Sequence, residues 1–435
     1  MLAFLAAGFV VSASAEPRKV LVVSVTKGFR HDVIPTVDQM LGDLAKQCGK
    51  FEVVYVKTDQ DMEEKMTADA LKGYDGVVFN NTTGDLPLPD RDGFLAWIKS
   101  GKGFVGLHAA TDTFPGFPAY TDMIGGLFKT HGPQVGVECL NQDPFHPATR
   151  HLSPRTYVFD EIYQVKAFYR HRVHGLLTLD KHPNTGVPGD YPIAWCKAYG
   201  QGKVFYTSLG HRTDVVARED YRLHVLNGIL WALGDLPGDA TVPSNAYQVS
   251  ADEQALGFKA LFNGVDLAGW RFRNPSAAKT WSAQNGMLVN EISDQVHGTD
   301  LITEEKFTDF VVRYEYMIPR GANSGFYLHG RHEIQILDDY PACQASNSSD
   351  GSIYNFAAPA RFASRKPGEW NQVEASMRGN RVTVVLNGVK IHDNLVVDRP
   401  TGSELDGNVN EPGPFFVQGD HGCVAFRNLR VKVLK

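Results

Sequence analysis

Short, continuous apolar runs alternate with amphipathic stretches from Lys19 to about Gly234. The apolar runs lie at 19–25, 51–56, 73–80 and 101–108, and helical periodicity is clearest between them at 33–47 and 89–100. Unbroken apolar strands separated by helices are typical of a parallel sheet that is covered on both faces. The first half of the chain is therefore predicted to be an α/β domain with a mostly parallel sheet.

The pattern changes at Phe258, where short alternating runs are separated by Gly and Asn turns. Clear examples are 307–319, 381–394 and 423–434, and "LNGV" (386–389) is an Asn-Gly hairpin turn between two such runs. Alternation without long helices predicts an antiparallel, all-β sandwich or jelly roll. The two halves thus belong to different fold classes.

A length of 435 residues exceeds what one ordinary core accommodates, so two domains are expected. The polar stretch 239–257 predicts a linker between domains at 16–238 and 258–435. Residues 1–15 combine an apolar run with a small-residue A-x-A site, which predicts a secretory signal peptide and a periplasmic or secreted protein. No other run approaches the ~18 apolar residues of a membrane span.

Composition narrows the classes of ligand. A formal charge of −6 gives no basic footprint, which argues against nucleic acid as the partner. The five cysteines include no C-x-x-C pair, so a cysteine-bound zinc is not expected, and free thiols are favoured over disulfides for most of them. No nucleotide cofactor is expected.

Polar residues follow the strands of the first half, where open α/β sheets bind their ligands. His31, His108 and Asp112 stand at such strand ends, and "GKGFVGLHAATDTF" leads a strand into a Gly-rich turn at His108-Ala109-Ala110. In glutamine-amidotransferase-like folds this turn carries a nucleophilic Cys, which is absent here. Histidines with a carboxylate suit either a divalent metal ion or acid–base chemistry on a sugar.

Seven motifs of the first half occur in the order seen in the ThuA-like (trehalose-utilisation) family, which residues 19–234 resemble. The motifs are "KGFRHD", "GLHAATDTF", "GGLFKTH", "HPATRHL", "DEIY", "YPIAWCKAYGQGKVFYTSLGH" and "HVLNGILWALG". The resemblance implies an amidotransferase-like fold without its Cys, acting in sugar metabolism. Its motifs map onto two sets, a substrate set of His31, His108 and Asp112 and a divalent-metal set of Glu161, His131 and His211. Hydrogen-bonded structural roles for His131 and His211 are the alternative.

In the second half, the stretch "NSGFYLHGRHEIQILDD" (323–339) has the alternation of a strand with one polar face. A period of two puts Arg331, Glu333 and Gln335 on one face, opposite an apolar face that includes Ile334 and Ile336. The polar face is predicted to be the open floor of a site. The alternative is a solvated face on which Glu333 pairs with Arg331.

Residues 258–434 resemble the 3-keto-disaccharide hydrolase domain family. "FNGVDLAGW", "NSG…EIQILD" and "AFRNLRV" carry the resemblance, which implies a concanavalin-like β-sandwich that cleaves glycosides already oxidised at C3. A C3 ketone acidifies the C2 proton, so that the C1 oxygen leaves by β-elimination and water then adds. Such chemistry needs a base, an acid for the leaving group and a group that stabilises the enolate, which a divalent cation would also supply.

Glu333 is the leading base or metal ligand, His421 is an acid or second ligand, and Asp338 is a weaker candidate. Substrate contacts are assigned to Arg331, Gln335, Asn323 and Gln418. An oxidised sugar is the expected partner, together with a sugar 3-dehydrogenase that makes it. Two rivals remain: the sandwich is a carbohydrate-binding module for the first domain, or the sandwich alone is active. Exposed aromatic residues favour a binding module, and converging titratable groups favour an enzyme.

Overall fold

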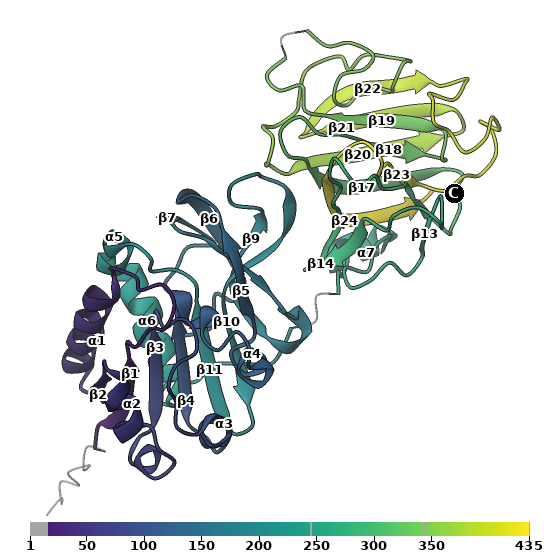
Figure 1. Cartoon of the computed structure of the whole chain (residues 1–435). Coiled ribbons are helices and arrows are strands. Elements are labelled where there is room, and N and C mark those ends of the chain that lie inside the picture. The colour runs from purple at the N-terminus through teal and green to yellow at the C-terminus, as the bar shows by residue number, and fades with distance from the viewer. Residues whose placement is uncertain (1–15, 244–245, 343, 435) are drawn as a thin grey trace, which may run out of the picture. The chain divides into compact units, whose positions relative to one another are not determined.

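The computed structural model describes residues 16–243, 246–342 and 344–434. The chain forms two compact units, one made of residues 1–177 and 192–242 and the other of residues 178–191 and 243–435. In Figure 1 the first unit runs from purple to teal, and the second runs from green to yellow apart from residues 178–191, which have blue-to-teal colours. The predicted signal peptide, 1–15, lies outside the described residues.

The first unit is built on a nine-stranded sheet, ordered β2-β1-β3-β4-β11-β10-β9-β6-β7. Its parallel strands are those of the predicted apolar runs, joined by one later strand: β1 (Arg18–Val23), β2 (Phe51–Val56), β3 (Gly76–Asn80), β4 (Gly103–Leu107) and β11 (Gly202–Thr207). The remaining strands are β5 (Leu127–His131), β6 (Val135–Asn141), β7 (Arg155–Asp160), β8 (Tyr163–Lys166), β9 (His174–Lys181) and β10 (Pro188–Tyr199).

The sheet is mixed, whereas the sequence predicts a mostly parallel one. β10 and β11 run antiparallel because only Gly200 and Gln201 separate them, and a two-residue connection cannot bring a chain back in parallel. β6 and β7 are also antiparallel, and β5 pairs with β8 in a separate two-stranded sheet. The parallel half of the sheet is the half that the apolar runs predict.

Helices cover both faces of the parallel strands, as predicted. One side carries α1 (Ile34–Cys48), α5 (Thr213–Ala217) and α6 (Glu219–Ala232), and the other carries α2 (Asp59–Lys65), α3 (Arg91–Lys99) and α4 (Pro118–Ile124). Figure 1 shows α1 and α5 on one side of the strands and α3 and α4 on the other. The short 3₁₀ helices are η1 (Ala70–Gly73), η2 (His108–Asp112) and η3 (Arg170–Arg172).

The second unit contains two antiparallel sheets. The larger has the order β14-β15-β24-β17-β20-β21-β22, with β12 paired to β24, and the smaller has the order β13-β16-β23-β18-β19. The strands of the larger sheet are β12 (Phe258–Ala260), β14 (Trp281–Gln284), β15 (Met287–Asn290), β17 (Phe310–Met317), β20 (Asn371–Arg378), β21 (Arg381–Leu386), β22 (Val389–Val396) and β24 (Val424–Val433). Those of the smaller sheet are β13 (Trp270–Phe272), β16 (Leu301–Thr303), β18 (Asn323–Leu328), β19 (His332–Leu337) and β23 (Phe416–Val417).

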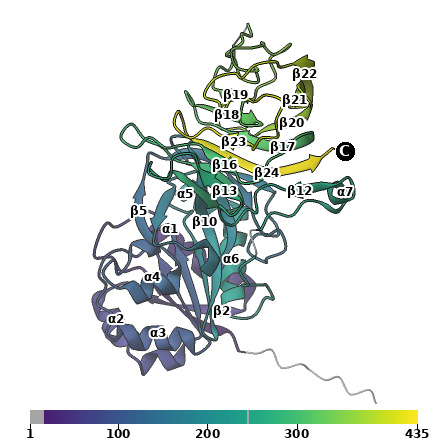
Figure 2. The ribbon, with the colours of Figure 1, turned by 90° about the vertical axis from the view of Figure 1, so that its right-hand side faces the viewer.

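One apolar core lies between the two sheets. It takes Val312 and Ala375 from the larger sheet and Phe326 and Ile334 from the smaller. In Figure 2, β18 and β19 lie on one side and β20, β21 and β22 on the other. The predicted Asn-Gly hairpin joins β21 to β22, with both turn residues at positive φ, which two-residue hairpins of this kind require.

The segment predicted to be a linker is partly structured. It contains α7 (Ala251–Ala255), whose Glu253 accepts hydrogen bonds from Arg313 at 2.9 Å and Arg430 at 2.7 Å. Four cysteines are free thiols, and the fifth, Cys343, lies outside the described residues. None of the helices in the described ranges is both long enough and apolar enough to span a membrane.

Candidate functional site

The strand-to-helix turn after β4 places a buried histidine in an unusual backbone conformation. His108 has φ 45°, a left-handed value that residues with a side chain rarely adopt, and it is fully buried. Its ring Nδ1–H donates to the Ser208 carbonyl at 2.6 Å, and its own carbonyl accepts from the Tyr206 hydroxyl at 2.7 Å. Strain of this kind persists where surrounding contacts impose it, and it clusters at functional sites.

The carboxylate of Glu161 lies at the centre of a histidine cluster. Its Oε2 is 3.2 Å from His211 Nδ1 and 3.5 Å from His108 Nε2, and its Oε1 is 3.2 Å from His131 Nδ1. His211 Nδ1 and His108 Nε2 are 3.3 Å apart. The neighbouring Asp160 ties two of these segments together, because its Oδ2 accepts from the Gly210 backbone N–H at 2.7 Å.

His31 completes the cluster from the loop that follows β1. Its ring centroid is 5.0 Å from that of His108 and 5.4 Å from that of His211, and its Nε2 is 3.3 Å from the Tyr163 hydroxyl. The ring is buried, and its Nδ1 has no hydrogen-bond partner among the described residues. His31, His108, Glu161 and His211 each offer one ligand atom, and these four atoms lie within 4.8 Å of one another.

The ionisable groups of the cluster shift one another's pKa values in different directions. Burial, together with the nearby His108 and His211, lowers the pKa of His31 to about 3. Burial alone would raise the pKa of Glu161, but hydrogen bonds from His108 and His211 bring it well below its usual range. The hydrogen bond to Glu161 raises the pKa of His211. The Glu161 carboxylate is therefore kept ionised by the histidine rings that donate hydrogen bonds to it.

The sequence distributes these residues differently from the structure. Glu161 and His211 are predicted metal ligands, and both lie in the four-residue group. His31 and His108 are predicted to contact substrate, but they lie in the same group as the two predicted ligands. The third predicted ligand, His131, is on the exposed side of Glu161. Asp112 lies at the end of η2, outside the group of four, and burial raises its pKa.

Tyr163, the last residue of "DEIY", is a member of the site that the sequence did not predict. Tyr163 contacts His31, and its ring lies 4.2 Å from that of His108. Its position two residues after Glu161, at the start of β8, is the only signal that sequence offered.

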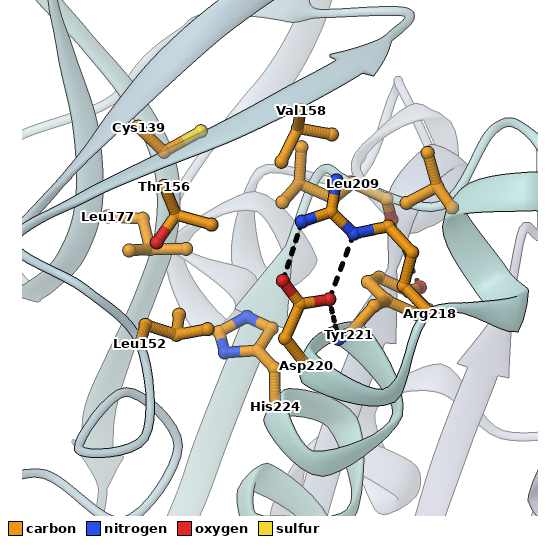
Figure 3. Close-up of a pocket in the computed structure, with 11 residues that line it drawn as sticks. Cys139, Leu152, Thr156, Val158, Leu177, Leu209, Arg218, Asp220, Tyr221 and His224 are labelled. Atoms are coloured by element: carbon orange, nitrogen blue, oxygen red, sulfur yellow. Dashed lines mark hydrogen bonds and ion pairs between the residues drawn. The ribbon is translucent and has the colours of Figure 1, made fainter.

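Two of the three cysteines in the first unit are buried away from solvent. Cys139 and Cys196 are fully buried, and burial raises the pKa of the Cys139 thiol to about 12 and that of Cys196 well above its usual range. A cavity of about 20 Å³ lies beside Cys139, and it is lined also by His224 and by the ion pair between Arg218 and Asp220 (Figure 3). A space of this size holds about one water molecule, so it does not accommodate a sugar.

In the second unit, the pairing of β18 with β19 places the residues predicted from alternation. Tyr327 stands opposite Glu333 and Gly325 opposite Gln335, while Ile334 and Ile336 belong to the core between the sheets. The predicted alternation is confirmed for residues 332–337, so Glu333 and Gln335 share the face of the smaller sheet that points away from the core.

That face is covered rather than open at Glu333. The side chain is only 3% exposed, its Oε2 accepts from the Tyr327 hydroxyl at 2.7 Å, and its backbone N–H donates to Thr401 Oγ1 at 2.9 Å. A Cβ atom at Gly325 would lie 2.3 Å from Glu333 Oε1, so only glycine leaves room for this carboxylate. Tyr327 is itself held by stacking on Phe416, with ring centroids 3.7 Å apart.

Burial gives Glu333 the protonation behaviour of a general base. It raises the pKa of the carboxyl to about 7, partly offset by the Tyr327 hydrogen bond and the nearby His421, and reinforced by Asp300 and Asp420. A carboxylate whose pKa lies close to neutral pH combines a useful basicity with a substantial ionised fraction. Glu333 and His421, predicted separately, are thus close enough to interact electrostatically.

The surroundings of His421 contain residues that the sequence did not single out. His421 Nδ1 is 2.5 Å from Asp420 Oδ1, and the His421 side chain is about half exposed. Asp300, which directly precedes β16, is bound by Arg273 at 2.9 Å and accepts from the Gly419 backbone N–H at 3.2 Å. Asp300 lies in no motif, and only the pairing of β16 with β23 brings it beside the 418–421 segment.

Two predicted substrate contacts carry unused hydrogen-bonding atoms. Gln418 Oε1 and Asn323 Oδ1 are buried without a hydrogen-bond partner within the described ranges. Gln418 lies beside Gly325, because its backbone N–H donates to the Gly325 carbonyl at 2.9 Å. Gln335 Oε1 accepts from the Ile336 backbone N–H at 2.9 Å. Buried acceptors of this kind ordinarily have partners, and sugar hydroxyl groups are suitable donors.

Two other predicted residues have structural contacts instead. Arg331 precedes β19 and binds the segment after β22: its Nε lies 2.6 Å from Asp406 Oδ1, and an Nη–H donates to the Glu411 carbonyl at 2.7 Å. The alternative of an Arg331–Glu333 pair is therefore wrong. Asp338 Oδ2 accepts from the Gly321 backbone N–H at 2.7 Å, and five extended residues, roughly 16 Å, separate it from Glu333. The two carboxylates do not converge.

Each half of the chain matches a known protein family. Residues 19–232 match the ThuA family, described as trehalose utilisation, and residues 257–432 match the 3-keto-alpha-glucoside-1,2-lyase-like domain family. A "3-keto-disaccharide hydrolase" of Bacteroides thetaiotaomicron is 27% identical over 297 residues, which cover 56% of this chain and 98% of the relative.

Two solved structures are also similar. A protein of Parabacteroides merdae, provisionally described as ThuA-like, is 21% identical with a TM-score of 0.44, over 53% of this chain and 94% of its own. A protein of Parabacteroides distasonis, provisionally described as a glycosyl hydrolase, is 29% identical with a TM-score of 0.35, over 41% of this chain and 84% of its own.

Proposed function

Because the chain joins a ThuA domain to a 3-keto-alpha-glucoside-1,2-lyase-like domain, we propose that it is a carbohydrate enzyme that cleaves 3-keto-glycosides in its second domain. The observation that carries this proposal is the buried Glu333 carboxyl, whose pKa is raised to about 7 within a polar patch of the smaller sheet. The relative named a 3-keto-disaccharide hydrolase supports the same substrate class.

The first chemical step removes a proton from the sugar. The carboxylate of Glu333 accepts the proton from C2, which the neighbouring C3 ketone acidifies, and the electron pair delocalises into an enolate. The C2–C1 double bond then forms as the C1–O bond breaks, and the departing oxygen takes a proton. His421, next to Asp420 and interacting with Glu333, is the proposed donor of that proton.

The second step adds water across the new double bond. The oxygen of water bonds to C1 while its proton passes to His421, which gave one up in the first step, and Glu333 returns its proton to C2, so both groups are restored and the net reaction is hydrolysis. The Tyr327 hydroxyl, which binds Glu333, positions the carboxyl in both steps. Gln418 and Asn323 accept hydrogen bonds from sugar hydroxyls, because their buried oxygens otherwise have none in the described part of the chain.

The substrate class implies the reaction that supplies it. A glycoside with a ketone at C3 arises by oxidation of the C3 hydroxyl, so a sugar 3-dehydrogenase is the proposed functional partner. The first domain would bind or act on a related oxidised sugar. At a finer level we assign the first domain to the glutamine-amidotransferase-like folds and the second to the concanavalin-like sandwiches, and we place the protein in the periplasm or outside the cell.

The alternative role of the sandwich as a carbohydrate-binding module has weaker support. A binding module stacks sugar rings on exposed aromatic side chains. The aromatic rings on the Glu333 face, Tyr327 and Phe416, are 1% and 0% exposed. Converging titratable groups are present instead, which is the pattern of an active site.

The test is the release of free sugar from 3-keto-trehalose or a 3-keto-glucoside. Intact protein, Glu333→Gln, and a chelator-treated sample are compared, with the exposed Glu304→Gln as the matched control. We expect release by the intact protein and by Glu304→Gln, and a loss of at least a hundredfold in Glu333→Gln. No release by the intact protein would contradict the proposed function, and unchanged release by Glu333→Gln would contradict the choice of base. Loss on chelation would show that cleavage depends on a metal ion.

A further inference from the structure

We propose that His31, His108, Glu161 and His211 form a binding site for a divalent metal ion of the zinc class in the first domain. We further propose that the oxygen atoms of a sugar α-hydroxyketone bind the ion as additional ligands and expand its coordination beyond these four side chains. The site is defined by the first domain alone and does not depend on cleavage in the second. The choice of an α-hydroxyketone as its ligand rests on the proposed function.

The spacing of the ligand atoms is the first argument. Tetrahedral ligands about 2.05 Å from zinc are separated by about 3.3 Å along each edge of the tetrahedron. Glu161 Oε2, His211 Nδ1 and His108 Nε2 are separated by 3.2, 3.5 and 3.3 Å. Three ligand atoms therefore already lie at tetrahedral edge distances around a common centre, and His31 lies within 4.8 Å of them.

The orientation of His108 is the second argument. Its Nδ1–H donates to the Ser208 carbonyl, so Nε2 is the ring atom that faces Glu161 and His211, and a bound ion would replace the proton that Nε2 donates to Glu161. Histidines that bind metals nearly always donate their second ring N–H to a carbonyl or carboxylate, because this fixes the tautomer and the ring direction. His108 also has a left-handed backbone, and strained residues of this kind cluster at functional sites.

His31 supplies an independent sign of a missing ligand. The side chain is only 4% exposed, yet its Nδ1 has no hydrogen-bond partner within the described part of the chain. A buried nitrogen without a partner is costly unless something occupies its lone pair. His131 holds the other oxygen of Glu161 from the exposed side, so it is a positioning residue and not a ligand in this arrangement.

The surroundings favour a sugar as the additional ligand of the proposed ion. The ring of Phe29 is 69% exposed and lies 4.8 Å from that of His31. Exposed aromatic rings beside polar groups are the usual platform for sugar rings. The Tyr163 hydroxyl lies 3.3 Å from His31 and adds a hydrogen-bonding group next to the proposed ion. A ketone with an adjacent hydroxyl offers two neighbouring oxygen atoms, and a bound metal ion acts as a Lewis acid toward a carbonyl oxygen.

Metal content tests the site without using activity. The full chain, stripped with a chelator and reloaded with Zn²⁺, is compared with Glu161→Gln and His211→Ala by titration and elemental analysis. His171→Ala serves as the control, since His171 is an exposed histidine outside the cluster. We expect one Zn²⁺ per chain in the parent and in the control, and at least a tenfold weaker affinity in the other two variants. Circular dichroism checks that each variant is folded, and the isosteric Glu161→Gln keeps the test valid if His211→Ala fails to fold.

Equal affinity in all four proteins, or no bound Zn²⁺ in the parent, would overturn the metal site. Replacement by Co²⁺ then tests the ligand, because a four-coordinate Co²⁺ ion has intense visible absorption that changes when a ligand binds. We expect a spectral change with a 3-keto-glucoside and none with the unoxidised glucoside. An unchanged spectrum with both would overturn the assigned ligand class. Failure of the parent to cleave 3-keto-glycosides would leave the Zn²⁺ stoichiometry untouched, so the two proposals fail separately.

Discussion

Replacing Glu333 by Gln is expected to stabilise the protein at alkaline pH, although it removes the proposed base. The pKa of the Glu333 carboxyl rises from an ordinary 4.5 to about 7 in the folded protein, mainly through burial. A group whose folded pKa is raised contributes stability that is fully present below its unfolded pKa, and this contribution is lost as the pH rises through the folded pKa. The buried charge is therefore a growing cost from about pH 4.5 to pH 7.

The size of that cost follows from the shift. A difference of about 2.5 pH units corresponds to roughly 3 kcal/mol, at about 1.4 kcal/mol per unit. The cost is nearly complete at pH 8 and falls to about 1 kcal/mol at pH 5, where the folded carboxyl is protonated. Gln cannot ionise, and its amide oxygen still accepts from the Tyr327 hydroxyl, so the variant avoids the cost.

Calorimetric melting of the parent and of Glu333→Gln at pH 5 and pH 8 measures the effect. At pH 8 we expect the transition of the second domain to rise by roughly 6–12 °C, since about 1 kcal/mol moves a domain of this size by 2–4 °C. At pH 5 the difference should shrink to a third or less. The exposed Glu304→Gln should show no such pH dependence. An equal or lower melting temperature for Glu333→Gln at pH 8 would refute the raised pKa and, with it, the argument for Glu333 as base.

Three further outcomes follow from the same contacts. The rate of 3-keto-glycoside cleavage should rise with pH, reach half its maximum near pH 7 and level off above about pH 8, because the base must be ionised; a pH-independent rate between pH 5 and 8 would contradict this. Gly325→Ala should lower cleavage at least tenfold and destabilise the second domain by about 1–3 kcal/mol in a urea titration, because its Cβ would collide with Glu333 Oε1. Asp406→Ala should destabilise the second domain by about 1–3 kcal/mol in the same titration, since it leaves the buried Arg331 guanidinium without its carboxylate. An unchanged stability would show that Arg331 does not depend on this pair.

The periodicity of the sequence was sufficient to predict features that depend only on neighbouring residues of one strand or turn. The alternation along β19 predicts the face of Glu333 because strand geometry fixes the direction of every second side chain. The Asn387-Gly388 turn is predicted for the same reason, since local backbone preference determines it. Both depend on residues that are close in sequence.

Contacts between distant segments were beyond the same reasoning. His31 and His211 meet across most of the first domain, and only the order of the parallel strands brings their loops together. Arg331 was predicted to contact substrate from its place beside the strand, but its guanidinium pairs with Asp406. Asp406 lies in an irregular segment, where no periodic pattern predicts the pair. Asp300 likewise joins the Glu333 site through strand pairing alone.

The two clusters treat their carboxylates in opposite ways, and this separates their chemistry. Around Glu333, burial dominates and the carboxyl holds its proton near neutral pH, which suits a base that must take up and return a proton but makes a poor ligand for a cation. Around Glu161, hydrogen bonds from His108 and His211 outweigh burial and keep the carboxylate charged, which suits a metal ligand. Of the two roles that sequence left open for Glu333, base or metal ligand, the electrostatics therefore favour the base. Within the described residues, the only group of His, Cys, Asp and Glu side chains arranged to hold an ion is the one in the first domain.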